Sequence, residues 1–189
     1  MLRKLPFETS EPILERFDLS EEGALIVAPE MPPETAIEVL FKADLMVDML
    51  KYFAHGMPPR EGACWAVATM RDSLGALDTK DQDVLTLAEK WVKDPQEGLR
   101  IQLMDEGETR DNEDPFRWLC CAIAWNGSGS IGPKGGPSVL PATGLHASAL
   151  IGAVSLLVGT SEDALAEVHK SAYRYGLEVA QGGWPMRID

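Results

Sequence analysis

No apolar run in the sequence is long enough to cross a membrane. The longest uncharged stretch covers residues 135–161, but it opens with a glycine- and proline-rich loop, and its apolar part is only 145–158. A transmembrane helix needs about 20 apolar residues. Two basic residues open the chain, yet the apolar segment of a secretory signal does not follow them. We therefore expect a soluble, cytoplasmic protein that does not contact a membrane.

Basic residues are scarce. The chain has 17 Lys and Arg against 30 Asp and Glu, and its formal net charge is −13. Because such a chain repels the phosphates of nucleic acids, nucleic-acid binding is not expected. Acidic pairs such as Asp105 and Glu106 lie in a highly charged stretch, which we interpret as solvated surface.

Cysteine is scarce as well. Cys64, Cys120 and Cys121 make an odd number, and all three lie in apolar surroundings, which predicts buried, reduced thiols. The chain has neither C-x-x-C nor H-x-x-x-H spacing. The sequence therefore predicts no metal site and no cofactor.

Alternating strand patterns are also missing, whereas helix signals are frequent. They predict an all-α fold, a compact single-domain bundle of about seven helices over residues 34–189. Residues 1–33 contain five prolines and are expected to form an extended arm. Residues 24–28 of this arm are β-prone and predict one short strand. We expect the helices at 116–125 and 145–158 to lie at the centre of the bundle.

Capping residues predict where the helices begin and end. One helix is expected over 34–53 and ends at His55-Gly56. Further starts are predicted at Pro58, Asp78 or Thr79, Asp94, Asp114, Thr143 and Ser161, and the last helix stops at Gly182-Gly183.

Recognisable catalytic motifs are absent. Gly127, Gly129 and Gly132 match G-x-G-x-x-G, but Pro133 prevents a helix from starting directly after them, and it stands where a phosphate-binding loop requires Lys. Ser128 and Ser130 lack the spacing of G-x-S-x-G. The sequence therefore predicts no catalytic residue. We interpret the loop as an ordered crossover between two central helices, with a binding loop as the alternative.

Four residues are candidates for partner binding. Asn126, Ser128 and Lys134 belong to the glycine- and proline-rich loop, and Trp184 follows the glycines that end the last helix. An aromatic residue at such a position either folds back onto the domain or anchors a partner. We expect Trp184 to fold back, and we keep the anchor as the alternative.

Arg100 and two histidines leave further alternatives. Arg100 is a candidate anion-binding residue, or it pairs with Glu97 or Asp105 and neutralises the acidic stretch. His146 and His169 lie on the last two helices, which we expect to be antiparallel neighbours. A contact between their imidazoles is therefore expected.

A set of short motifs is distinctive in combination. They are Trp65-Ala66, Asp94-Pro95 with Arg100, Trp125-Asn126-Gly127-Ser128-Gly129-Ser130, Gly144-Leu145, Gly152-Ala153-Val154 and Gly176-Leu177-Glu178-Val179-Ala180-Gln181-Gly182-Gly183. With these motifs, residues 34–184 resemble an uncharacterised family of bacterial all-helical proteins, a domain of unknown function associated with type VI secretion gene neighbourhoods. The resemblance implies an accessory or adaptor role.

The leading hypothesis is a non-enzymatic interaction protein. It would be an adaptor, chaperone or accessory factor of a bacterial secretion system, and its loop and arm would contact a protein partner. One alternative is an enzyme with an unrecognised site near the loop, built from Asn126, Ser128, Lys134 and His146, with Arg100 holding an anion. Convergence of these side chains in one pocket would favour it. The other alternative is a homo-oligomeric structural protein.

Overall fold

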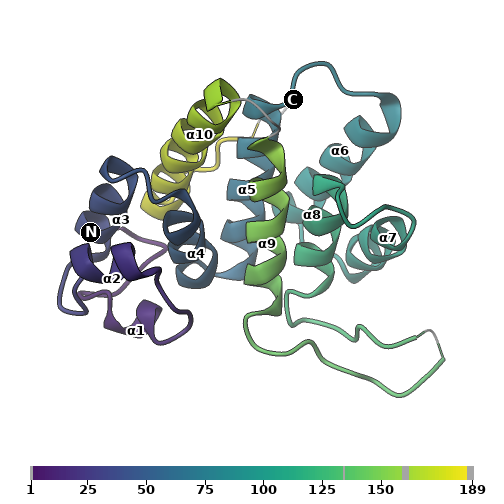
Figure 1. Cartoon of the computed structure of the whole chain (residues 1–189). Coiled ribbons are helices and arrows are strands. Elements are labelled where there is room, and N and C mark those ends of the chain that lie inside the picture. Colours follow the sequence, from purple (N-terminus) through teal and green to yellow (C-terminus); the bar gives the residue numbers. More distant parts are fainter. Residues whose placement is uncertain (1, 134, 159–161, 187–189) are drawn as a thin grey trace.

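The computed structural model describes residues 2–133, 135–158 and 162–186, and in these ranges all regular secondary structure is helical (Figure 1). The elements are α1 (Glu11–Leu14), α2 (Glu21–Ile26), α3 (Pro33–Lys42), α4 (Met46–Gly56), α5 (Pro59–Ser73), α6 (Thr79–Lys93), α7 (Glu97–Glu108), α8 (Pro115–Ala124), α9 (Leu145–Ser155), the 3-10 turn η1 (Leu156–Val158) and α10 (Glu162–Gln181). The predicted all-α class is confirmed. The described residues form ten α-helices rather than about seven. Within these ranges, no helix is long and apolar enough to span a bilayer.

Helix α5 lies at the centre of the bundle. It contacts α4, α6, α8, α9 and α10, and every residue from Glu61 to Met70 is buried. The indole N–H of Trp65 donates to the carbonyl oxygen of Ala172 on α10 at 2.9 Å. The helices expected at the centre, 116–125 and 145–158, belong to the same central group. They pack against each other as α8 and α9, and both lie alongside α5 (Figure 1).

The N-terminal segment is not an extended arm. It contains α1 and α2, and the strand predicted at 24–28 is wrong because Glu21–Ile26 is helical. Apolar side chains of this segment are part of the core, namely Leu2, Leu5, Ile13 and Val27. Ser20 caps α2. The N–H and the hydroxyl of Ser20 donate in turn to the buried carboxylate of Asp48 on α4, at 3.0 Å and 2.5 Å. Contacts with α4 thus stabilise a helical conformation in a segment whose local sequence predicts an extended one.

The helix predicted over 34–53 is divided into α3 and α4. Asp44 lies at the break with a φ of 58°, a conformation uncommon for residues other than glycine. Its carboxylate is 2.7 Å from Nδ1 of His169 on α10, and the imidazole also packs against the ring of Phe41. The expected contact between His146 and His169 is not among the interactions of the described residues.

Five of the predicted helix boundaries are confirmed, among them the end of α4 at Gly56 and the start of α5 directly after Pro58. The side chain of Asp78 accepts a hydrogen bond from the N–H of Asp81 at the start of α6, and that of Asp114 accepts one from Phe116 at the start of α8. Gly182, with a φ of 101°, follows the end of α10. These signals are local, so the sequence alone identifies them.

Two other boundaries differ from the prediction. The N-cap of α7 is Gln96 rather than Asp94, and the N-cap of α9 is Gly144, with a φ of 81°, rather than Thr143. In both cases the side chain that resembles a cap precedes the residue at which the backbone turns into the helix. The start predicted at Ser161 lies outside the described residues.

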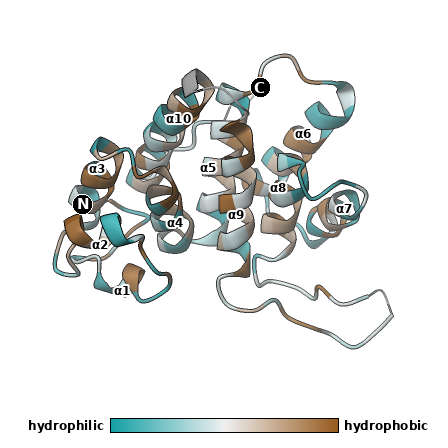
Figure 2. Ribbon diagram, viewed as in Figure 1, coloured by the Kyte–Doolittle hydropathy of each residue, from teal (hydrophilic) through white to brown (hydrophobic). Residues whose placement is uncertain are grey.

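The acidic stretch between α6 and α8 is more than solvated surface. The guanidinium of Arg110 is buried and binds three carboxylates, those of Asp81 at 2.7 Å, Asp114 at 2.8 Å and Glu106 at 3.0 Å. These ion pairs connect α6, α7 and the start of α8. Figure 2 shows hydrophilic residues on the outer turns of α6 and α7 around this network.

The three cysteines are free thiols, as expected. Cys64 and Cys120 are buried, and burial raises the pKa of each thiol to about 12. A thiol that stays protonated near neutral pH is a poor nucleophile and a poor metal ligand. The structure therefore places these two cysteines in the core as small apolar side chains.

Candidate functional site

The connection between α8 and α9, residues 126–144, extends away from the helices (Figure 1). We call it the projecting loop. At its first residue, the Asn126 amide donates to the carbonyl oxygen of Ile123 at 2.6 Å, while its side-chain oxygen accepts the N–H of Ser128 at 2.9 Å. Asn126 thus ends α8 and starts the loop with a fixed turn.

Arg100 anchors the base of the projecting loop. Its guanidinium is 1% exposed and makes two hydrogen bonds of 2.7 Å with the carboxylate of Glu97. The same group donates to the carbonyl oxygens of Ala124 at 2.8 Å and Ser130 at 3.0 Å. The carboxylate of Glu97 therefore occupies the position that an external anion would take, and the hydrogen bond from Arg100 lowers the pKa of that carboxyl.

Gly129 lets the projecting loop approach this ion pair. A Cβ atom at this position would lie 2.7 Å from Nη2 of Arg100 and 2.8 Å from Oε1 of Glu97, which is too close for a side chain. The glycine that matches a nucleotide-binding pattern in the sequence therefore packs against the ion pair between the buried Arg100 and the exposed Glu97.

Beyond its base, the projecting loop is held in shape by Ser130. The hydroxyl oxygen of this residue accepts the N–H of Gly132 at 3.1 Å and that of Val139 at 3.0 Å, and the N–H of Ile131 donates to the carbonyl oxygen of Val139 at 2.8 Å. Val139 is nevertheless 46% exposed and Leu140 is 65% exposed. Lys134 lies outside the described residues. The loop is thus an ordered structure that presents apolar side chains to solvent.

A cleft of about 300 Å³ lies beside the base of the projecting loop. Asn126 and Ser128 line it, together with Arg60, Trp91, Gln96, Glu97, Pro58, Pro59 and Pro95. Arg60 donates from Nε to the carbonyl oxygen of Val92 and from Nη2 to that of Lys93. Two of the candidate residues therefore share a cleft in which three prolines and Trp91 lie beside polar side chains.

Trp184 folds back onto the domain next to this cleft. Its ring lies 4.9 Å from the guanidinium carbon of Arg60 and 5.6 Å from the ammonium nitrogen of Lys4. Such cation–π contacts stabilise an aromatic ring at a surface. The side chain is still 37% exposed, so part of the ring remains accessible.

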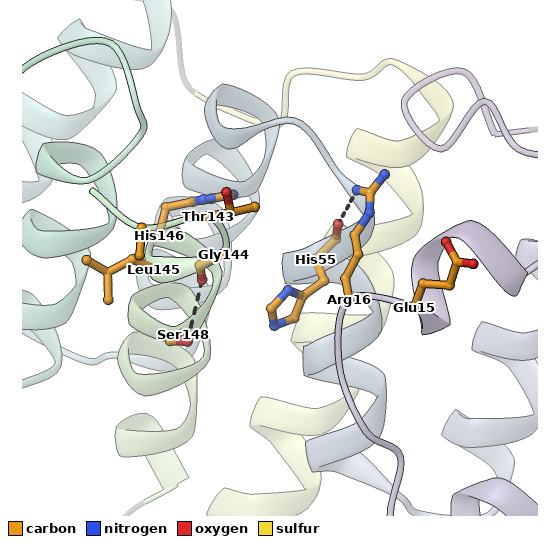
Figure 3. Close-up of a pocket in the computed structure, with 9 residues that line it drawn as sticks. Glu15, Arg16, His55, Thr143, Gly144, Leu145, His146 and Ser148 are labelled. Atoms are coloured by element: carbon orange, nitrogen blue, oxygen red, sulfur yellow. Dashed lines mark hydrogen bonds between the residues drawn. The ribbon is translucent and has the colours of Figure 1, made fainter. Parts of the chain in front are cut away.

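The polar residues of the enzyme alternative do not converge. Asn126 and Ser128 line the cleft just described, whereas His146 lines a different pocket of about 630 Å³ at the other end of the projecting loop (Figure 3). Arg100 lines neither of them and is buried in its ion pair with Glu97. Because the enzyme alternative requires these side chains to converge in one pocket, their separation argues against a single active site built from them.

The pocket around His146 contains residues that the sequence did not single out. Arg16 and Glu15 approach from the end of α1, and His55 approaches from the last turn of α4 (Figure 3). The ring of His55 stacks on that of Phe17 with centroids 5.3 Å apart. No spacing in the sequence links positions 16, 55 and 146, because only the packing of α1, α4 and α9 brings them together.

Acidification below about pH 6.5 is expected to lower the stability of the protein. Burial lowers the pKa of the imidazoles of His55 and His146 from the ordinary value of 6.5. Nearby positive charges, chiefly Arg16, lower the pKa of His55 further. The contribution of both imidazoles to stability is therefore present above about pH 6.5 and is lost as the pH falls through the folded-state values. Urea unfolding at about pH 7.5 and 5.5 measures this loss, which should be smaller in His146→Gln. If the stability of His146→Gln differed between the two pH values as much as that of the wild type, His146 would not contribute to the loss.

Metal binding has no obvious site in the described part of the chain. Within the ranges 2–133, 135–158 and 162–186, no three or more His, Cys, Asp or Glu side chains form a group suited to a metal ion. The pocket around His146 has two imidazoles and the carboxylate of Glu15 in its lining, but these three side chains do not form such a group.

The fold and these surfaces define a class, a small helical bundle that presents one long, anchored loop. Residues 36–180 match the model of DUF6931, a family of unknown function, and the chain belongs to that family. The match supports the resemblance to an uncharacterised domain and, like it, leaves out the N-terminal segment. No curated protein and no solved structure shows significant similarity to the chain.

Proposed function

We propose that the protein is a non-enzymatic interaction protein that binds a protein partner through the projecting loop. The observation that carries the proposal is the combination of order and exposure in this loop. Arg100 and Ser130 hold its backbone by hydrogen bonds, while Val139 and Leu140 present apolar surface to solvent. A loop that is ordered before binding loses little conformational entropy when it meets a partner.

The resemblance to bacterial proteins from type VI secretion gene neighbourhoods guides the choice of partner. In this proposal the protein is a cytoplasmic adaptor, chaperone or accessory factor, and the partner is a component of the secretion apparatus. The net charge of −13 favours a partner whose surface around its apolar contact is basic. It disfavours nucleic acid for the same electrostatic reason.

Loss of the apolar contact should weaken partner binding. The test variant is Val139→Ser combined with Leu140→Ser, and the control is Val47→Ser, which removes an equally exposed apolar side chain from α4. The tagged wild-type protein first captures a stoichiometric partner from its own cells, and binding of the purified partner is then measured for all three proteins. We expect the loop variant to bind at least about tenfold more weakly, because two buried apolar side chains contribute more than 1.4 kcal/mol.

Equal binding by the loop variant and the control would refute the role of the projecting loop. Light scattering on the free protein separates the homo-oligomer alternative. If the wild-type chain is an oligomer and the loop variant is a monomer, the partner of the loop is a second copy of this chain rather than another protein.

A further inference from the structure

The pocket between α1, α4 and α9 is separate from the cleft beside Asn126. Its volume of about 630 Å³ is in the range of small-molecule sites. Figure 3 shows Arg16 and Glu15 on the flank formed by the end of α1, and His55 on α4. The opposite flank is formed by the end of the projecting loop and the start of α9, with Thr143, Gly144, Leu145, His146 and Ser148. Three elements that are far apart in the sequence thus contribute polar groups to one concave surface.

Arg16 is held in place at the rim of this pocket. Its Nη1 donates to the carbonyl oxygen of His55 at 2.7 Å, and its guanidinium carbon lies 5.4 Å from the centre of the Phe7 ring. Within the described part of the chain, the side chain of Arg16 makes no hydrogen bond besides the one to His55. Its other N–H groups can therefore donate to a ligand. A guanidinium with several donors in one plane suits the paired oxygens of a carboxylate or phosphate.

The imidazole of His55 is also positioned before any ligand binds. His55 stacks on Phe17 with an angle of 24° between the rings, and His146 lies near enough to His55 for each charged form to repel the other. Neutral imidazoles donate one hydrogen bond each, and protonation adds a second donor and a charge. Both histidines can therefore serve an oxyanion that Arg16 holds.

Two positive charges act on His55 in this corner of an acidic protein. Burial comes first among the causes that lower the pKa of His55, and the charges of Arg16 and Lys51 lower it further. The start of α9 adds its partial positive charge, and its N-cap, Gly144, has no side chain to neutralise it. Glu15 supplies one negative charge at the rim, which disfavours ligands with many negative charges.

We propose that this pocket binds a small organic anion whose single carboxylate or phosphate group is held by Arg16 between His55 and His146. The site uses the last residues of the projecting loop, Ala142 to Gly144, but neither of the apolar residues proposed to contact a protein partner, Val139 and Leu140. It assigns the protein a ligand-binding capacity in addition to the proposed interaction role.

The three histidines make the proposal testable by NMR. Imidazole resonances of the full chain are followed while phosphate, acetate or chloride is added at constant ionic strength and at about pH 7.5 and 5.5. Phosphate or acetate should shift the resonances of His55 and His146 saturably, and the affinity should be higher at the lower pH because a bound anion favours imidazolium. The resonance of His169, which pairs with Asp44 elsewhere, should not move.

Matched variants decide whether the pocket is responsible. Arg16→Gln should weaken the binding of the same anion by about tenfold, whereas Arg174→Gln, which removes an exposed arginine paired with Asp72, should leave it unchanged. Saturation by acetate alone identifies a carboxylate ligand, and saturation by phosphate alone identifies a phosphorylated one. The proposal is overturned if chloride causes the same shifts, if neither oxyanion saturates, or if Arg16→Gln binds like the wild type.

Discussion

Replacing Arg100 with methionine is expected to lower the free energy of unfolding by about 3 kcal/mol. Methionine fills much of the same space but donates no hydrogen bond. The carbonyl oxygens of Ala124 and Ser130 would each lose a charged donor in a buried environment, and the carboxylate of Glu97 would lose its partner. Urea unfolding measures the change in stability.

The same variant should also loosen the projecting loop. The N–H groups of Ile131 and Val139 are bonded within the loop, so hydrogen exchange at these two sites reports its order. We expect both to exchange faster in Arg100→Met than in the wild type, because Ser130 is no longer tied to the helices. The prediction links the stability of the core to the shape of the proposed contact surface.

Two control variants make the Arg100 prediction specific. Arg100→Lys keeps the charge but has no planar fork, so it should recover only part of the lost stability. Arg174→Met removes an arginine from an exposed pair with Asp72 and should cost less than about 0.5 kcal/mol. If Arg100→Met were as stable as Arg174→Met, Arg100 would not be the anchor of the loop.

Replacing Gly176 with alanine is expected to destabilise the protein by about 2 kcal/mol, although alanine is the better helix former. A Cβ atom at this position of α10 would lie 2.4 Å from Cζ of Phe53 and 2.5 Å from its Cε2. The ring of Phe53 is fully buried and packs against Trp65, with ring centroids 5.5 Å apart. The ring cannot move without displacing the centre of the bundle, so α10 must shift instead.

Gly98 provides the matched control for this prediction. It lies in α7, is exposed, and a Cβ atom there would meet no heavy atom within 4 Å. Gly98→Ala should therefore stabilise the protein by up to about 1 kcal/mol. Thermal or urea unfolding compares the two variants, and Phe53→Leu should partly rescue Gly176→Ala by making room. Equal gains from both glycine substitutions would show that α10 is not tightly packed at Gly176.

Local signals in the sequence determined the fold class and several boundaries. Asp78 and Asp114 have side chains that bond to N–H groups only a few residues away, and Gly182 turns the chain by its own backbone conformation. The candidate site was predictable to a similar extent. The loop at 126–137 stands out in the sequence by its glycines and prolines. The pairing of Arg100 with Glu97 is one of the two that the sequence suggests, because these residues are three positions apart on a helix.

Only the tertiary structure decided the features that depend on distant residues. Arg100 meets Ser130 thirty positions along the chain, and the pocket joins Arg16, His55 and His146 from three separate helical regions. The break at Asp44 and the helical N-terminal segment likewise depend on contacts with α10 and α4. Helix caps act within one turn and can be recognised in the sequence, whereas side chains that meet across helices are set by packing, which the sequence encodes only through the complete fold.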